Sequence, residues 1–380
     1  MKKKILFVTE RRADYSKLRP VIATIKKSPK FDYYLVVTGS HLIKKQGYTI
    51  NEIKKDGFKI YRKFHMFYEN EDDSTATMTT AFGRAVINLT KIVRSLKPDI
   101  VFSGFDIGAN FAAAVVGAHM NIHVAHLEGG EITGTIDESI RHATSKFSHI
   151  HFTSNEKATK RLVKMGEQSK HVFTVGNPSL DVIKNMKAFS KNQLEKEFKI
   201  DLKKPFLLVV QHTVTTEIKK IDKYFLETIK AIKELDIQSI IIAGNVDAGS
   251  QKIKKIIENS KISYYDHLPF DKYISLLYHA SAIIGNSSSG IMEAPFLRIP
   301  SINIGTRQEG RGKITSIINV GYDKKKIKKA INKALTNKSF LSKIKKQKNQ
   351  HGDGTASKKI IQILEKIDLE KIPIQKKLTY

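Results

Sequence analysis

Short runs of apolar and β-branched residues alternate with longer stretches of helical periodicity along the whole chain. The runs are apolar almost throughout, which is typical of parallel strands that helices cover on both faces. The predicted strands are 4–9, 32–39, 99–105, 122–128, 149–154, 172–176, 206–212, 239–245, 262–268, 282–287 and 301–305. The pattern therefore predicts an α/β protein of the doubly wound type.

A polar, lysine-rich stretch, 184–205, divides these predicted strands into six and five. A single sheet containing all of them would be unusually large. With 380 residues the chain is long enough for two cores. We therefore expect a Rossmann-like domain over 1–185 and a second over 200–350, with the helical tail 355–380 packing back on the first.

Many of the unusual polar residues lie at the end of a predicted strand or just after it. Arg12, Asp106, His212 and Arg307 all have this position. Ligands of open α/β sheets bind at the carboxyl ends of the strands. Two such edges that face each other would form an interdomain active-site cleft.

Composition narrows the class of protein. Apolar residues make up 41% of the chain, which is typical of a globular protein, and no apolar run approaches the roughly 20 residues of a membrane span. The apolar part of the N-terminus covers only Ile5–Val8, so it predicts a first strand rather than a signal peptide. The chain has no cysteine, which excludes disulfides, thiolate nucleophiles and Cys-ligated zinc. We expect a cytoplasmic protein without a membrane partner.

The net charge of +29 raises the alternative of nucleic-acid binding. Much of the excess lies in Lys325–Lys348, where lysines surround predicted helices without interleaved aromatic residues. Arginines, which dominate base recognition, are few. The charge therefore favours solvated helix faces over a nucleic-acid partner, and a diffuse positive field still attracts phosphorylated small molecules.

The stretch "HLEGGEITGTIDESIRH", 126–142, gathers acids and imidazoles in this basic chain. "GTIDESIRH" is expected to begin a helix, and plain helix capping would also place acids in its first turn. Ionisable groups crowded at a cleft edge push one another's pKa values apart, as acid and base roles require. Asp106 and His212 would face this stretch. Its candidate residues are His126, Glu128, Asp137, Glu138, Arg141 and His142.

Histidines near this stretch raise the possibility of a metal site. No spacing of two histidines and a carboxylate on one helix face occurs, so we expect no metal. On their predicted strand His149 and His151 share a face, which is typical of structural histidines.

"IIGNSSSGIMEAP", 283–295, leads from a predicted strand through a turn of small residues into a helix. The N–H groups of Ser287–Gly290 and the helix dipole would hold a phosphate, with Glu293 about one turn into the helix as a ribose ligand. An ordinary helix N-cap is the alternative. Arg307, after the next strand, adds a fixed cation at the same edge and favours a nucleotide diphosphate.

"RRADYSKL", 11–18, is the matching turn after the first strand. Arg12 and Ser16 could reach an anion across the cleft. The turn is not the Gly-rich dinucleotide fingerprint, and the chain contains no P-loop. A polar loop before a helix explains this segment equally well.

These segments together resemble a known family. The segments are "RADYSKL", "HLEGGEITGTIDESIRH", "QHTVTTEIK", "NVDAGS", "HLPFDKY", "GNSSSGIMEAP" and "INIGTRQEGR". They are similar to the hydrolysing UDP-N-acetylglucosamine 2-epimerases of sialic acid biosynthesis and to the epimerase half of the bifunctional animal enzyme. The resemblance runs in order over 5–311 and implies the two-domain GT-B fold.

The resemblance also implies the reaction. UDP is eliminated anti from the sugar to give 2-acetamidoglucal, and hydration of the glycal then releases N-acetylmannosamine. No metal or other cofactor is required. A homodimer or homotetramer is expected.

The family's roles carry over by motif position. Asp106, Glu128 and Asp137 are the implied acids and bases, and His126, Glu138, Arg141, His142 and His212 would support them. The implied nucleotide and substrate contacts are Arg12, Ser16, Asn245, Asp247, Leu268, Ser287, Ser288, Ser289, Gly290, Glu293 and Arg307.

One departure from the family pattern bears on the substrate. The family has "HGD" followed by Arg after the third strand, whereas this chain has "SGFDIGAN" with Ser103 in place of the histidine. Asp106 aligns only if one residue is inserted. Related enzymes act on UDP- or GDP-linked 2,4-diacetamido-2,4,6-trideoxyglucose for legionaminic acid, which is the alternative substrate. A GT-B glycosyltransferase is the more distant alternative.

Overall fold

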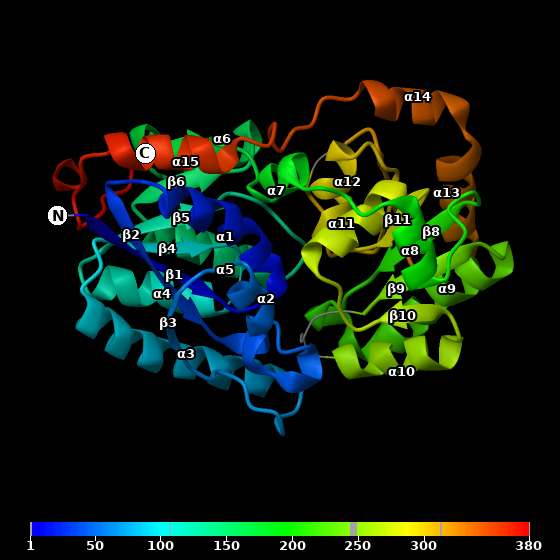
Figure 1. The fold of residues 1–380 in the computed structure, drawn as a ribbon, viewed down its shortest axis with the longest axis horizontal. Coiled ribbons are helices and arrows are strands. Elements are labelled where there is room, and N and C mark those ends of the chain that lie inside the picture. The colour runs from blue at the N-terminus through cyan, green and yellow to red at the C-terminus, as the bar shows by residue number, and fades with distance from the viewer. Residues whose placement is uncertain (1, 107, 244–248, 312–313, 380) are drawn as a thin grey trace.

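The computed structural model describes residues 2–106, 108–243, 249–311 and 314–379, which form two α/β units side by side (Figure 1). In the described residues, the first unit has a parallel sheet in the order β3-β2-β1-β4-β5-β6-β7. Its strands are β1 (Lys3–Thr9), β2 (Phe31–Val37), β3 (Ile60–Lys63), β4 (Ile100–Gly104), β5 (His123–Leu127), β6 (Ile150–Thr153) and β7 (Val172–Thr174).

Helices cover both faces of this sheet. Ile5 and Phe7 of β1 pack into one apolar core, and the alternate residues Leu6 and Val8 pack into the other, as the period of a strand requires. The helices of this unit are α1 (Arg12–Ile25), α2 (Ile50–Lys55), α3 (Thr75–Leu96), α4 (Gly108–His119), α5 (Ile136–Phe147), α6 (Glu156–Lys164), and the 3-10 helices η1 (Gly39–Leu42), η2 (Lys44–Gln46) and η3 (Ser169–His171). The helix α7 (Ser179–Asn185) lies between the units, because Leu180 and Ile183 pack into the core of the second unit while the helix also contacts α1.

The second unit has a parallel sheet in the order β10-β9-β8-β11-β12-β13 within the described part of the chain. Its strands are β8 (Phe206–Val210), β9 (Gln238–Ile242), β10 (Ser263–Tyr265), β11 (Ala282–Gly285), β12 (Ser301–Ile304) and β13 (Ile317–Val320). Its helices are α8 (Lys191–Phe198), α9 (Ile221–Leu235), α10 (Ser250–Ser260), α11 (Phe270–His279), α12 (Glu293–Phe296), α13 (Lys324–Thr336), α14 (Lys338–Lys346), η4 (Thr215–Lys220) and η5 (Ser288–Gly290).

The prediction of a doubly wound α/β fold is confirmed, and two such units about a shared cleft are the GT-B architecture. β3 and β13 are strands that the apolar pattern did not predict. Both lie at the edge of a sheet and are partly exposed, and both carry polar residues at their exposed positions.

The C-terminal tail returns from the second unit to the first (Figure 1). It contains α15 (Ala356–Lys366) and η6 (Leu369–Lys371). Ile360 and Leu364 of α15 pack into the same core as α1. Asp181 of α7 accepts hydrogen bonds from the N–H groups of Ala356 (2.9 Å) and Ser357 (2.6 Å), which satisfies free donors at the start of α15.

Candidate active site

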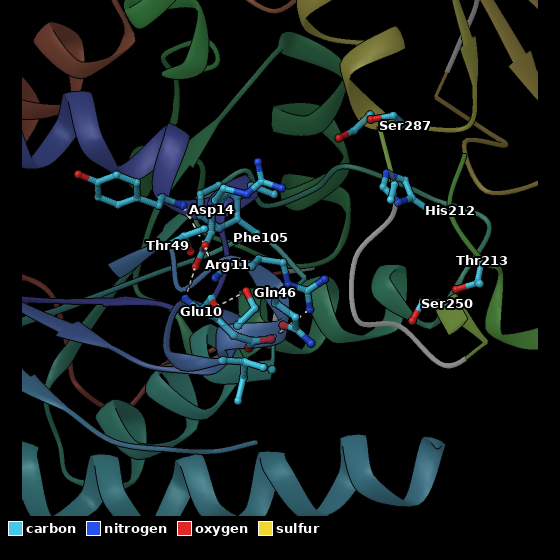
Figure 2. A pocket seen from close by; sticks show the side chains of 18 of the residues that line it. Glu10, Arg11, Asp14, Gln46, Thr49, Phe105, His212, Thr213, Ser250 and Ser287 are labelled. Atoms are coloured by element: carbon cyan, nitrogen blue, oxygen red, sulfur yellow. Dashed lines mark hydrogen bonds and ion pairs between the residues drawn. The ribbon is translucent and has the colours of Figure 1, made fainter. Parts of the chain in front are cut away.

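A cleft of about 1320 Å³ lies between the units and is lined by loops of both. The loops follow the carboxyl ends of β1, β4 and β5 in the first unit and of β8, β11 and β12 in the second. In Figure 2, Glu10 and Phe105 lie on one side of the cleft, and His212 and Ser287 lie on the other.

Many of the sequence-predicted site residues line this cleft. They are Arg12, Ser16, Asp106, Glu128, Asp137, Arg141, His212, Leu268, Ser287, Ser288, Ser289, Glu293 and Arg307. Asn245 and Asp247 lie outside the described residues.

Glu128 directly follows β5 and has an unusual backbone conformation, with a φ of 62°. Its N–H donates to Phe152 O at 2.8 Å, and its side chain is almost fully buried. Lys17 of α1 donates to Glu128 Oε2 at 2.7 Å, whereas Oε1 is buried without a hydrogen bond among the described residues. A buried carboxylate oxygen of this kind is available to a ligand.

The side of the cleft that belongs to the first unit is called the first-unit wall. Asp106 and Arg141 lie at its centre. Arg141 is almost fully buried and donates through Nη2 to Asp106. Burial alone would raise the pKa of Asp106, but the charges of Arg141, Arg311, Lys17 and Arg307 outweigh it and hold the pKa below its ordinary value. Asp106 is therefore held as a carboxylate.

The start of α5 positions the rest of this wall. Thr135 is the N-cap, and its Oγ1 accepts from the N–H of Asp137 at 3.2 Å. Asp137 and Arg141 are four residues apart, so the helix presents them on one face toward the cleft.

Four other predicted residues lie away from the cleft lining. His126 is buried behind the wall, where Ser145 Oγ lies 3.1 Å from its Nδ1. Glu138 accepts from the N–H of Thr133 at 2.8 Å, and His142 lies beside Glu138 on α5. Gly290 is buried in the turn after β11.

The predicted phosphate turn, Ser287–Gly290, differs from the predicted strand-to-helix transition. Ser288–Gly290 form the 3-10 helix η5, and the N–H of Gly290 is bonded to Ser287 O at 3.1 Å. Glu293 is the first residue of the four-residue helix α12, not a residue one turn into a longer helix. A short helix adds little dipole, so serine hydroxyls are the principal donors of this turn.

Glu293 is buried at the base of the second-unit wall. Ser179 Oγ donates to its Oε1 at 2.7 Å, and burial raises the pKa of the Glu293 carboxyl. The backbone at His212 is fixed by Asn286, whose Oδ1 accepts from His212 N–H at 2.7 Å.

Residues of the two walls also meet. Arg307 Nη2 lies 3.8 Å from Asp137 Oδ2, and Arg307 Nη1 donates to Asn286 O at 3.2 Å. On another side of the cleft Arg12 donates to Leu268 O. Ser16 Oγ instead donates to Ala13 O of its own helix at 3.0 Å.

Sequence reasoning missed several charged residues of the cleft. Glu10 follows β1 and Lys17 lies on α1, whereas Arg311 comes from the second unit. Glu10 accepts from the N–H of Ala109 at 2.8 Å at the start of α4. Lys17 belongs to the segment "RRADYSKL", 11–18, and its position five residues after Arg12 could have indicated that it lies at the cleft.

The arrangement can transfer protons next to a bound anion. One wall presents carboxylates beside fixed cations, and the other presents hydroxyls, a carboxylate and Arg307. Among the described residues, no three His, Asp or Glu side chains gather in a way that could hold a metal ion. None of the helices in the described ranges is long and apolar enough to cross a membrane.

Similar proteins identify the family. The sequence profile of UDP-N-acetylglucosamine 2-epimerase matches residues 23–365. A Legionella pneumophila protein named UDP-N,N'-diacetylbacillosamine 2-epimerase (hydrolyzing) is 35% identical over 373 residues and covers 97% of both chains. A Neisseria meningitidis UDP-N-acetylglucosamine 2-epimerase is 36% identical over 336 residues, with 87% of each chain covered.

Solved structures of proteins named as 2-epimerases have a similar fold. A crystal structure of UDP-GlcNAc 2-epimerase from Neisseria meningitidis bound to UDP-GlcNAc superposes with a TM-score of 0.83 at 20% identity, covering 96% of this chain and all of that one. The sequence profile and the relatives extend over nearly the whole chain and include both walls of the cleft. The chain therefore belongs to the UDP-N-acetylglucosamine 2-epimerase family.

Proposed function

We propose that this chain is a hydrolysing 2-epimerase that converts UDP-N-acetylglucosamine and water into N-acetylmannosamine and UDP for sialic acid-type biosynthesis. The proposal rests on the fact that carboxylates on one side of the cleft face hydroxyls and an arginine on the other side. Asp106, Glu128 and Asp137 face a wall that contains Ser287 and Arg307. A cleft that only held a nucleotide would not need three carboxylates beside it.

In the first step, a carboxylate of the first wall removes the proton from C2 of the sugar. The electron pair of the C2–H bond forms the C1–C2 double bond, and UDP leaves C1 with the electrons of the C1–O bond. Arg307 and the hydroxyls of Ser287 and Ser288 stabilise the charge on the leaving diphosphate. The product of this step is 2-acetamidoglucal.

In the second step, water adds its oxygen to C1 of the glycal, and a proton is delivered to C2 on the opposite face. A carboxylate accepts the proton of the water, and a protonated acid supplies the proton to C2. Asp106, Glu128 and Asp137 are the groups proposed for these transfers. The two steps consume one water and need no metal or redox cofactor.

The test uses the purified chain with UDP-N-acetylglucosamine and no acceptor. The proposal predicts equal amounts of UDP and free N-acetylmannosamine, identified by NMR. A GT-B glycosyltransferase would release sugar only onto an added acceptor, so an absolute acceptor requirement would contradict the proposal.

An apolar surface favours a second candidate substrate. Ile136 and Ile140 are four residues apart on α5 and form a stripe beside the stripe of Asp137 and Arg141. Ile136 is 50% exposed, and both isoleucines line the cleft. This stripe suits a sugar with a 6-methyl and a 4-acetamido group better than one with hydroxyls.

The Legionella relative named for N,N'-diacetylbacillosamine makes this candidate concrete. Competition between UDP-N-acetylglucosamine and UDP-2,4-diacetamido-2,4,6-trideoxyglucose in one reaction decides between them. A higher kcat/KM for the second sugar, lost in Ile140→Asn, would assign the chain to it. The GDP-linked sugar serves as a test of the nucleotide.

A further inference from the structure

Two loops from different units interlock next to the cleft. Residues 131–137 follow β5 in the first unit, and residues 305–311 follow β12 in the second. Gly134 N–H donates to Arg307 O at 3.1 Å. A Cβ atom at Gly134 would lie 2.2 Å from Thr306 O, so only glycine allows this approach.

Arg311 extends this contact into the first unit. Its Nε donates to Ile132 O at 2.9 Å. Its Nη1 is buried and has no hydrogen-bond partner within the part of the chain that the structure describes. Arg311 lines the cleft, and the ionisable groups whose charges act on it are Arg141, Glu131, Asp106 and Glu128.

We propose that Arg311 is a positioning residue that the nucleotide-binding unit supplies to the proton-transfer cluster of the other unit. It fixes loop 131–137 and the Asp106–Arg141 ion pair when the two units close on the nucleotide. The inference rests on the proposed function, because it assumes that the first-unit wall transfers the protons. Its consequence is that sugar chemistry is coupled to UDP binding.

A chain of contacts explains how UDP binding would be coupled to the first unit. Arg307, on the same loop as Arg311, faces both the phosphate turn and Asp137. A diphosphate that engages Arg307 therefore fixes the loop that carries Arg311. The positive charges that act on Asp106 are Arg141 on α5, Lys17 on α1, and Arg311 and Arg307 on this loop.

Hydrogen–deuterium exchange of segment 131–141, with and without UDP, tests the positioning role directly. In the wild type we expect UDP to slow exchange in this segment. In Arg311→Gln we expect UDP to bind within about fivefold of the wild-type Kd, which is about 1 kcal/mol, without slowing this exchange. If Arg311→Gln retains the UDP-dependent protection, the proposal is wrong.

The pH profile of kcat provides a second readout. The charge of Arg311 contributes to lowering the pKa of Asp106, so its removal should raise that pKa and shift the acidic limb to higher pH. We also expect kcat to fall about tenfold or more. Arg311→Lys keeps the charge and should restore the position of the limb. An unshifted limb in Arg311→Gln would contradict the proposal.

Arg161→Gln is the matched control. Arg161 of α6 donates to Gly130 O, so it holds the residue directly before this segment from within the first unit without lining the cleft. This variant should keep both the UDP-dependent protection and the wild-type pH limb. If the wild type released no sugar, the proposed function would fail, but the exchange comparison would still decide on Arg311.

Discussion

Glu128 shows most clearly how the fold prepares a single residue. Its φ of 62°, together with a φ of 66° at Phe105, places two non-glycine residues in the left-handed region at the ends of neighbouring strands. Such conformations cost about 1–3 kcal/mol each and persist where the surrounding structure imposes them. The backbone bond to Phe152 O and the ion pair with Lys17 impose this one.

Glu128→Gln tests the role of this carboxylate. The glutamine keeps the shape and much of the hydrogen bonding but cannot accept a proton. We expect nearly normal UDP affinity by calorimetry and a fall in turnover on the order of a hundredfold or more. Loss of UDP binding in a folded variant would show that Glu128 holds the nucleotide instead.

Arg307→Ala should lose UDP affinity, in contrast to Glu128→Gln. It removes a charge-assisted contact to the diphosphate worth about 1.5–3 kcal/mol, so UDP affinity should fall about ten- to a hundredfold. Arg94→Ala, an exposed arginine on α3, controls for a general loss of positive charge. Equal UDP affinity in the Arg307 and Arg94 variants would remove Arg307 from the nucleotide site.

Sequence patterns predict site residues that share one segment better than site residues that come together only through folding. Glu128, Asp137 and Arg141 share one stretch of chain, so a strand followed by a helix start predicts their common edge. Arg311 reaches that stretch only because a second unit brings its loop there. No local pattern in the sequence contains that contact.

At the level of elements, the apolar runs predicted the central strands and the edge strands β7 and β10, whereas the edge strands β3 and β13 could not be predicted. β3 and β13 are each four residues long and have neighbours on one side only, so their exposed positions carry polar residues. The phosphate turn is the other exception. Its small residues favour a helix N-cap and a 3-10 turn equally, and packing against β12 selects the turn.

The C-terminal segment after η6 is fastened to the first sheet by histidines. His123 Nε2 lies 2.8 Å from Ile372 O, and His149 Nε2 lies 3.0 Å from Ile374 O. Val124 N–H donates to His149 Nδ1 at 3.0 Å, so the neutral ring donates from Nε2. Burial lowers the pKa of His149 from 6.5 to about 4.

This shift predicts an acid-sensitive tail. Because the folded pKa of His149 is depressed, its contribution to stability is complete above pH 6.5 and is lost as the pH falls toward 4. Urea unfolding across this range should show a smaller loss of stability in His149→Gln than in the wild type. His65→Gln, at an exposed position, should follow the wild type. Identical slopes for all three proteins would contradict the assignment.

At the scale of the whole molecule, the proposed reaction depends on two units that meet around one cleft. The chain crosses between them at α7 and again before α15, and the loops 131–137 and 305–311 join them beside the reacting groups. The walls proposed to hold the nucleotide and to transfer protons are therefore connected through the backbone. Under the proposed function, this arrangement would enclose the sugar while the second unit holds UDP.

The isotope content of the released sugar tests this mechanism most directly. The purified chain is incubated in deuterated water with the UDP-linked sugar and no acceptor, and the product is examined by NMR. Elimination followed by hydration predicts one solvent deuteron at C2 of the free epimerised sugar, because the original proton is removed and replaced. Protium retained at C2 would contradict the elimination mechanism and the roles proposed for Asp106, Glu128 and Asp137.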